Sequence, residues 1–138
     1  MNDTIRNLIR EHEQPKDFSY VRPTMDKLKA VEGELGLTLP EQYVEFLLEY
    51  GDGGIGGFEF FGVGAKGNLS FLDETMHYRS LGLPGNLIVI ENCDEWVYCL
   101  DAKTGEVVSW SPDGEMLAEY PDFDSLLLEH LNDAIDNM

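Results

Sequence analysis

The sequence has very few basic residues. It contains 9 Lys and Arg residues against 27 Asp and Glu residues, which gives a formal net charge of −18 at pH 7. Because such a surface repels the phosphates of DNA and RNA, we expect no nucleic acid partner. Residues 70–138 carry 15 acidic and 2 basic residues, whereas residues 1–69 carry 12 and 7. The excess negative charge either serves solubility alone or speeds association with a basic partner.

Cysteine and histidine are also scarce. Cys93 and Cys99 are too few for a disulfide framework, and we expect both to be reduced and buried. His12, His77 and His130 are scattered singly, without the paired spacing of a structural zinc site. Two of them fall on apolar helix faces, which is more typical of packing than of a catalytic triad. We therefore predict no metal, no cofactor and no catalytic residue.

No apolar segment approaches the roughly 20 residues that a membrane span needs. The first residues also lack the uninterrupted apolar stretch of a secretory signal. We therefore expect no membrane partner and a cytoplasmic location. The length of 138 residues and the 43% hydrophobic content are typical of one globular domain, which we place over residues 1–138.

Apolar residues recur with helical spacing in the first part of the chain. Tyr43, Phe46, Leu47 and Tyr50 form one such stripe, and Gly51 follows it as a C-terminal stop. Stripes of this kind predict helices over residues 5–12, 25–35 and 40–50. Asp3 or Thr4 is available to cap the first helix, and we expect the second and third helices to pack as a hairpin.

The pattern changes to short apolar segments after residue 55. Aromatic residues between glycines predict a strand over residues 55–63, and a weak helix is predicted over residues 68–81. The run Leu87–Ile90 is typical of a strand covered on both faces, which we place at the centre of the sheet. Asp122 or Asp124 caps a last helix. Between the Leu87–Ile90 strand and this last helix, further strands are predicted over residues 96–100, 106–110 and 115–120.

This order of elements indicates the fold class. Helices precede and follow a strand meander, and strands and helices do not alternate along the chain. We therefore predict an α+β fold with a largely antiparallel sheet, N-terminal helices and a C-terminal helix packed against it.

Gly62, Gly64 and Gly67 match the G-x-G-x-x-G pattern of dinucleotide-binding proteins. That motif belongs to a parallel βαβ unit in a doubly wound sheet, whereas a meander follows here. We interpret these glycines as a connector that relieves crowding beside Phe60 and Phe61, and we expect no nucleotide cofactor.

Carboxylates are too abundant for an acid–base pair to be recognised from the sequence. Of the two tryptophans, Trp96 follows acidic residues at a strand entrance, which favours it over Trp110 as an interface residue. The alternative is that Trp96 lies in the core. Trp96 and carboxylates near the junctions of helices and sheet form the predicted partner-binding set: Asp52, Glu59, Asp73, Glu74, Asp94, Glu95 and Trp96.

The segment EGELGLTLPEQYVEFLLEYGDGG, residues 32–54, resembles the opening of the SUKH superfamily. It combines a helix that ends in Leu-Gly, an L-P-x-x-Y-x-x-F-L helix and a Gly-rich exit. The segments LIVI (87–90), YCLD (98–101) and FDSLL (123–127) are similar to the family's later strands and last helix. The resemblance extends over about residues 24–131.

The resemblance implies an α+β fold and, for bacterial members, a non-enzymatic immunity protein that neutralises a cognate polymorphic toxin. The toxin is frequently a nuclease, whose substrate groove is basic because it holds phosphates. The expected partner is therefore a basic toxin domain that this acidic chain occludes stoichiometrically, as a monomer or weak homodimer. Other family members resemble regulatory or scaffolding modules, and such a role without a toxin partner is the alternative.

Overall fold

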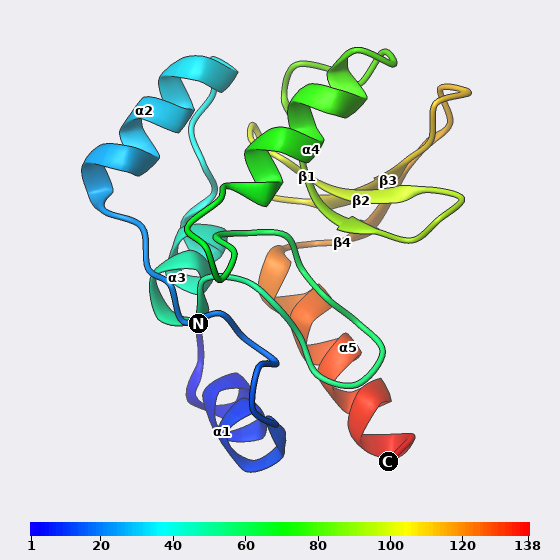
Figure 1. Cartoon of the computed structure of the whole chain (residues 1–138). Helices are drawn as coiled ribbons and strands as arrows, with labels where there is room; N and C mark the ends of the chain where they lie inside the picture. The colour runs from blue at the N-terminus through cyan, green and yellow to red at the C-terminus, as the bar shows by residue number, and fades with distance from the viewer.

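The computed structural model describes all 138 residues (Figure 1). Four strands form one antiparallel sheet in chain order, so that each strand pairs with the next. The elements are α1 (Asp3–His12), α2 (Met25–Leu35), α3 (Glu41–Tyr50), α4 (Ser70–Arg79), β1 (Leu87–Asn92), β2 (Val97–Asp101), β3 (Val107–Trp110), β4 (Met116–Tyr120) and α5 (Phe123–Asp136). None of the helices combines the length and the apolar character needed to cross a bilayer.

Helices cover both faces of the sheet, with α4 above it and α5 below it in Figure 1. Alternate strand residues point to opposite faces and therefore enter two different cores. The main core, shared with α1, α3 and α5, receives Ile88, Ile90, Leu100 and Val107. A smaller core, against which Tyr78 of α4 packs, receives Leu87, Val89, Val97, Cys99, Val108 and Trp110. The predicted α+β fold with an antiparallel sheet is confirmed.

Side-chain caps fix where the helices begin. Thr24 accepts a hydrogen bond from Lys27 N (3.1 Å) at the start of α2, as the sequence predicts. Asp122 does the same for α5 by accepting from Ser125 N (2.9 Å). The cap of α1 is Asn2 and not the expected Asp3 or Thr4, because α1 begins two residues earlier than its apolar stripe.

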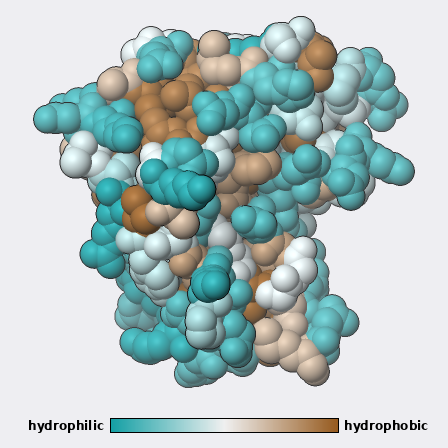
Figure 2. Space-filling model, in the orientation of Figure 1, coloured by the Kyte–Doolittle hydropathy of each residue, from teal (hydrophilic) through white to brown (hydrophobic).

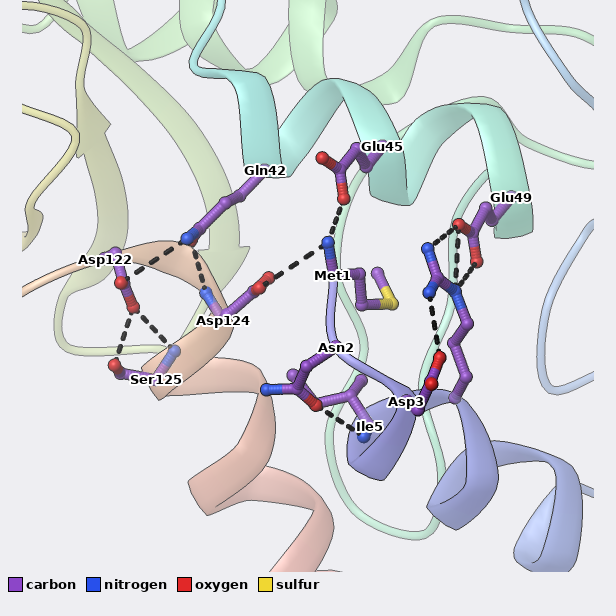
Figure 3. Close-up of polar contacts among 11 residues, drawn as sticks. Met1, Asn2, Asp3, Ile5, Gln42, Glu45, Glu49, Asp122, Asp124 and Ser125 are labelled. Carbon is purple, nitrogen blue, oxygen red and sulfur yellow. Dashed lines mark hydrogen bonds and ion pairs between the residues drawn. The ribbon is translucent and has the colours of Figure 1, made fainter.

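Polar contacts join α1, α3 and α5 below the sheet (Figure 3). Arg6 of α1 reaches Glu49 of α3, with Nη2 2.7 Å from Oε1. Gln42 of α3 accepts a hydrogen bond from the backbone N of Asp124 in α5 (2.9 Å). Burial raises the pKa of Asp124, and the Met1 ammonium 3.8 Å away acts in the opposite direction. The three helices therefore form one support for the main core.

The prediction of a strand over residues 55–63 is wrong. The segment between α3 and α4 is irregular and makes only isolated bridges, including those of Gly53 with Phe18 and with Phe60. Gly53 has a φ of 115°, and a Cβ there would collide with the carbonyl oxygen of Asp17. Tyr43 donates to the carbonyl oxygen of Phe61 (2.6 Å), so a helix satisfies a group that a neighbouring strand would satisfy in a sheet. Packing of the aromatic rings overrides the local strand preference.

The position of β1 also differs from the prediction, because β1 is an edge strand and not a central one. Its run Leu87–Ile90 is nonetheless buried on both faces, as the apolar sequence indicates. The run indicates that both faces are covered, which the two cores do here, and it does not indicate a neighbouring strand on each edge.

The expected hairpin of α2 and α3 is not formed. Figure 1 shows α2 projecting from the body at the upper left, and the two helices do not pack along one another. Leu28, Val31 and Leu35 still enter the main core, which explains the helical stripe in the sequence. Figure 2 shows apolar side chains gathered on the viewed face between α2 and α4, with polar side chains over most of the rest.

Candidate functional site

The outer edge of β1 is already occupied. The backbone N of Val89 donates to Oγ1 of Thr75 in α4 (3.0 Å). The carbonyl oxygen of Ile90 accepts from the backbone N of Phe61 (2.8 Å). Both groups are satisfied within the chain, and so this edge offers no backbone partner to another molecule.

The opposite edge of the sheet borders a groove. The groove, of about 590 Å³, lies over β2, β3 and β4, next to Tyr98. The ring of Tyr98 lies 6.1 Å from that of Trp96 and 6.2 Å from that of His130 in α5. The groove therefore lies on the α5 side of the sheet, beyond the part that α5 covers.

Exposed apolar side chains line this groove. On the groove face, Trp96 is 38% exposed and Leu117 66%. Met116, 53% exposed, borders the groove from the other face of β4, whereas Trp110 is 3% exposed and belongs to the smaller core. Trp96 therefore does not lie in the core, and its role at an interface stays a prediction. Large apolar groups at the surface are typical of interaction sites when they lie together.

Carboxylates surround these apolar groups without compensating positive charge. The groove is lined by Glu95, Asp113, Glu115 and Glu119, and none of its lining residues is Lys, Arg or His. None of these carboxylates forms a salt bridge. A hydrogen bond from the Ser111 hydroxyl lowers the pKa of Asp113, which favours its charged form.

The basic residues of the second half of the chain lie elsewhere. Arg79 donates to the carbonyl oxygens of Leu35 (2.8 Å) and Gly85 (2.9 Å). Lys103 lies in the turn between β2 and β3, whereas the groove lies at the other end of these strands, where β2 begins. The groove is consequently a local concentration of the negative charge that the composition shows.

The structure places the predicted contact residues in three regions. Asp94, Glu95 and Trp96 are exposed together in the turn from β1 to β2, and Glu95 and Trp96 line the groove. Asp73 and Glu74 lie on α4, and Glu59 is exposed in the irregular segment. The remaining residue, Asp52, is half-buried and accepts from Ser19 N (3.2 Å), and burial raises its pKa. Asp52, Glu59, Asp73 and Glu74 do not line the groove.

Sequence reasoning missed the part of the groove that comes from the last two strands. Ser109, Leu117 and Glu119 of these strands were not among the candidates, and neither was Tyr98 of β2. No signal in the sequence identified them, because two adjacent apolar residues in a strand, such as Met116 and Leu117, are equally typical of burial on both faces.

A buried hydrogen-bonded contact lies near the groove. Glu91 is 6% exposed, and its Oε1 lies 2.8 Å from Nε2 of His130. The His130 ring stacks on Phe60, with ring centroids 5.6 Å apart. Glu91 and His130 are hydrogen-bond partners, and their contact joins β1 to α5. This is the structural role expected of a histidine packed on an apolar helix face.

The remaining candidates for chemistry have structural roles. The Gly62 N–H of the glycine pattern donates to Oγ of Ser70 (2.9 Å), so this amide already has a partner within the chain. No three His, Cys, Asp or Glu residues are grouped so as to hold a metal ion. Cys99 is buried and Cys93 half-buried, both are free thiols, and burial raises the pKa of each to about 12.

A four-stranded meander between N-terminal helices and a C-terminal helix defines an α+β protein class, and the comparisons assign the family. The family model SUKH_5, described as SMI1-KNR4 cell-wall, matches residues 1–132. The chain belongs to the SUKH superfamily, as the resemblance in sequence implied. The crystal structure of a protein from Pseudomonas syringae pv. tomato is similar, with a TM-score of 0.65 and 26% identity over 85% of this chain and 89% of that chain.

Proposed function

We propose that this chain is an immunity protein that binds a basic toxin protein through the groove over β2, β3 and β4. The toxin is neutralised by stoichiometric occlusion in the cytoplasm of the producing cell. The observation that carries the proposal is the combination of exposed Trp96, Met116 and Leu117 with carboxylates that have no basic neighbour. Apolar anchors supply binding energy, and the surrounding charge selects a basic partner and speeds its capture.

A nuclease domain is the toxin class that this surface suits best. Its substrate groove holds phosphates and is therefore basic. An acidic protein on that groove, or beside it, blocks the substrate without any chemistry of its own, so the proposed role is non-enzymatic. Electrostatic steering raises association rates by roughly 10- to 1,000-fold, which favours capture before the toxin acts.

The first test is capture followed by rescue. The purified protein is immobilised, lysate of its source organism is applied at low salt, and bound proteins are eluted with rising salt. We expect one basic protein to elute, and we expect its toxicity in a host cell to be abolished when the present chain is co-expressed. A captured protein that remains toxic on co-expression contradicts the proposal. Several host proteins bound without rescue would favour the regulatory or scaffolding role.

The second test asks whether the groove is the contact site. We expect Glu95, Glu115 and Glu119, changed together to Lys, to weaken binding of the captured toxin more than tenfold, mainly through the association rate. The control changes three exposed acids on other surfaces by the same charge: Glu11→Lys, Asp26→Lys and Glu34→Lys. Equal losses in both triple variants would show that only net charge matters, and no loss in the first would exclude the groove.

A further inference from the structure

We propose that the partner binds as an added strand, with an extended basic segment pairing along the free edge of β4. This inference rests on the proposed function, because it states how the acidic groove engages the toxin. It predicts a property of the partner, namely a segment that is extended and in which basic and apolar residues alternate.

The hydrogen bonds of the sheet show which groups of β4 are free. Ser111 N donates to the carbonyl oxygen of Glu115 (3.1 Å), which lies opposite it in the β3–β4 register. Bonded and non-bonded pairs alternate along an antiparallel ladder, so Leu117 pairs with β3, whereas Met116 and Ala118 direct their N–H and C=O groups outward. These outward groups have no hydrogen-bond partner in any other element.

The β4 edge lacks three of the usual protections against pairing, although the strand is short and carries a bulge. Natural edge strands are commonly shielded by Lys, Pro or a covering element, and β4 has none of these between Met116 and Tyr120. Its first four residues are exposed. A bulge lies opposite Val107 and Val108, so three or four residues of straight edge precede it. This is the length of a short strand addition, in contrast to the covered edge of β1.

The charge around the edge selects a basic occupant over a second copy of this chain. A second copy would bring a net charge of −18 and its own carboxylates to the same place. A basic segment instead meets Glu115 and Glu119, which flank the exposed residues of the strand. Opposite charges on neighbouring strands stabilise pairing, and like charges oppose it.

The two faces of β4 determine which positions of the partner segment are basic and which are apolar. Leu117 lies opposite Ser109, whose hydroxyl donates to Glu119 (2.9 Å), so Leu117 and Glu119 share the face of the groove. Met116 lies opposite Trp110 and therefore projects to the other face. Because side chains of an adjacent strand alternate in the same way, Lys or Arg of the partner falls on the acidic face and apolar residues fall beside Met116.

The test uses a defined probe, the ten-residue peptide (Lys-Val)5, with (Glu-Val)5 as the charge control. Two-dimensional NMR of the full chain follows the amide protons of Met116 and Ala118 during titration at low salt. We expect the Lys peptide to shift both amides and to slow their hydrogen exchange about tenfold at saturation. The Glu peptide should leave them unchanged. No response of these amides at about 1 mM Lys peptide, a concentration that detects weak binding, overturns the proposal.

A backbone variant separates strand pairing from simple charge attraction. We expect Ala118→Pro, which removes one outward N–H and keeps the bonds to β3, to weaken binding of the Lys peptide about tenfold. Ala118→Ser keeps the N–H and should bind within about twofold of the wild type. If Ala118→Pro does not fold, Met116→Pro at the first strand position is compared with Met116→Ala. Equal affinity in the proline and control variants overturns strand addition.

The outcomes also separate this inference from the proposed function. Loss of toxin binding in the Lys triple variant, together with unaltered β4 amides, would leave the immunity role supported and exclude strand addition. Protected β4 amides without a captured, neutralised toxin would support the docking edge and contradict the immunity role.

Discussion

The two edge strands of the sheet differ in how far other elements of the chain cover them and bond to their backbone. At β1, α4 and the irregular segment supply hydrogen-bond partners, and the two cores bury both faces. At β4, the first four residues are exposed, and no element covers the outward backbone groups. The fold thus covers one edge (the closed edge) and leaves the other exposed (the open edge), so substitutions at the two edges should affect stability to different extents.

The largest expected effect is at the closed edge. Ile90→Ala should lower the free energy of unfolding by about 3 kcal/mol, because Ile90 is fully buried and its loss leaves a cavity. The matched change at the open edge, Leu117→Ala, should cost less than about 0.5 kcal/mol. Urea denaturation measures both. Similar losses at the two positions would contradict the distinction between the edges.

A smaller loss is expected where the closed edge meets α5. Glu91→Ala leaves Nε2 of His130 without its partner and should cost about 2 kcal/mol. Glu91→Gln keeps a hydrogen-bond acceptor at the same place and should cost less than Glu91→Ala. The comparison is made by thermal and urea denaturation at pH 7. Unchanged stability in Glu91→Ala would show that the contact with His130 contributes nothing.

Loss of the N-cap of α5, which directly follows β4, should lower the free energy of unfolding by an intermediate amount that depends on pH. Asp122→Ala removes the N-cap of α5 and should cost about 1 kcal/mol at pH 7. The Ser125 hydroxyl lowers the pKa of Asp122 below its ordinary value of 3.8, so its contribution is present above that pH and is lost as the pH falls through the native value. Denaturation from pH 7 to pH 2 should show the two proteins converging. Asp122→Asn retains a cap and serves as the control.

The smallest effect on stability is expected at the open edge itself. Trp96→Ala should change the free energy of unfolding by less than about 1 kcal/mol, because Trp96 is exposed at the end of the sheet. The affinity of the Trp96→Ala variant for the captured toxin should fall at least tenfold, because aromatic residues are frequent hot spots of interfaces. Trp110→Ala is the contrasting variant and should destabilise the fold. An unfolded Trp96→Ala protein would restore the core interpretation of this residue.

Most of the fold could be predicted from the sequence, because most of its elements carry a clear period. Three features were predicted close to their observed positions: the apolar stripe of α3, the helix caps Thr24 and Asp122, and the meander of the last three strands. The irregular segment was mistaken for a strand because its aromatic residues have strand preference, whereas their burial comes from α3, α5 and β1. Local patterns do not contain these distant contacts.

The candidate site was only partly accessible from the sequence. Glu95 and Trp96 were identified by their position at a strand entrance, and both line the groove. Leu117 and Glu119 were missed, because exposure in a strand depends on which neighbour covers it. The same limit explains why Leu87–Ile90 was placed at the sheet centre. The sequence indicates burial, but the order of strands decides which edge is free.

The irregular segment between α3 and α4 also bears on how the chain folds. Neighbouring strands of the meander are joined by short turns, so their contacts are close in sequence and should form early. The segment instead bonds to Ser19 through Val63 and to Ile90 through Phe61, contacts that span 44 and 29 residues. Closing these loops costs more entropy than forming a hairpin. We expect this stretch to order last during refolding, after the sheet against which it packs has formed.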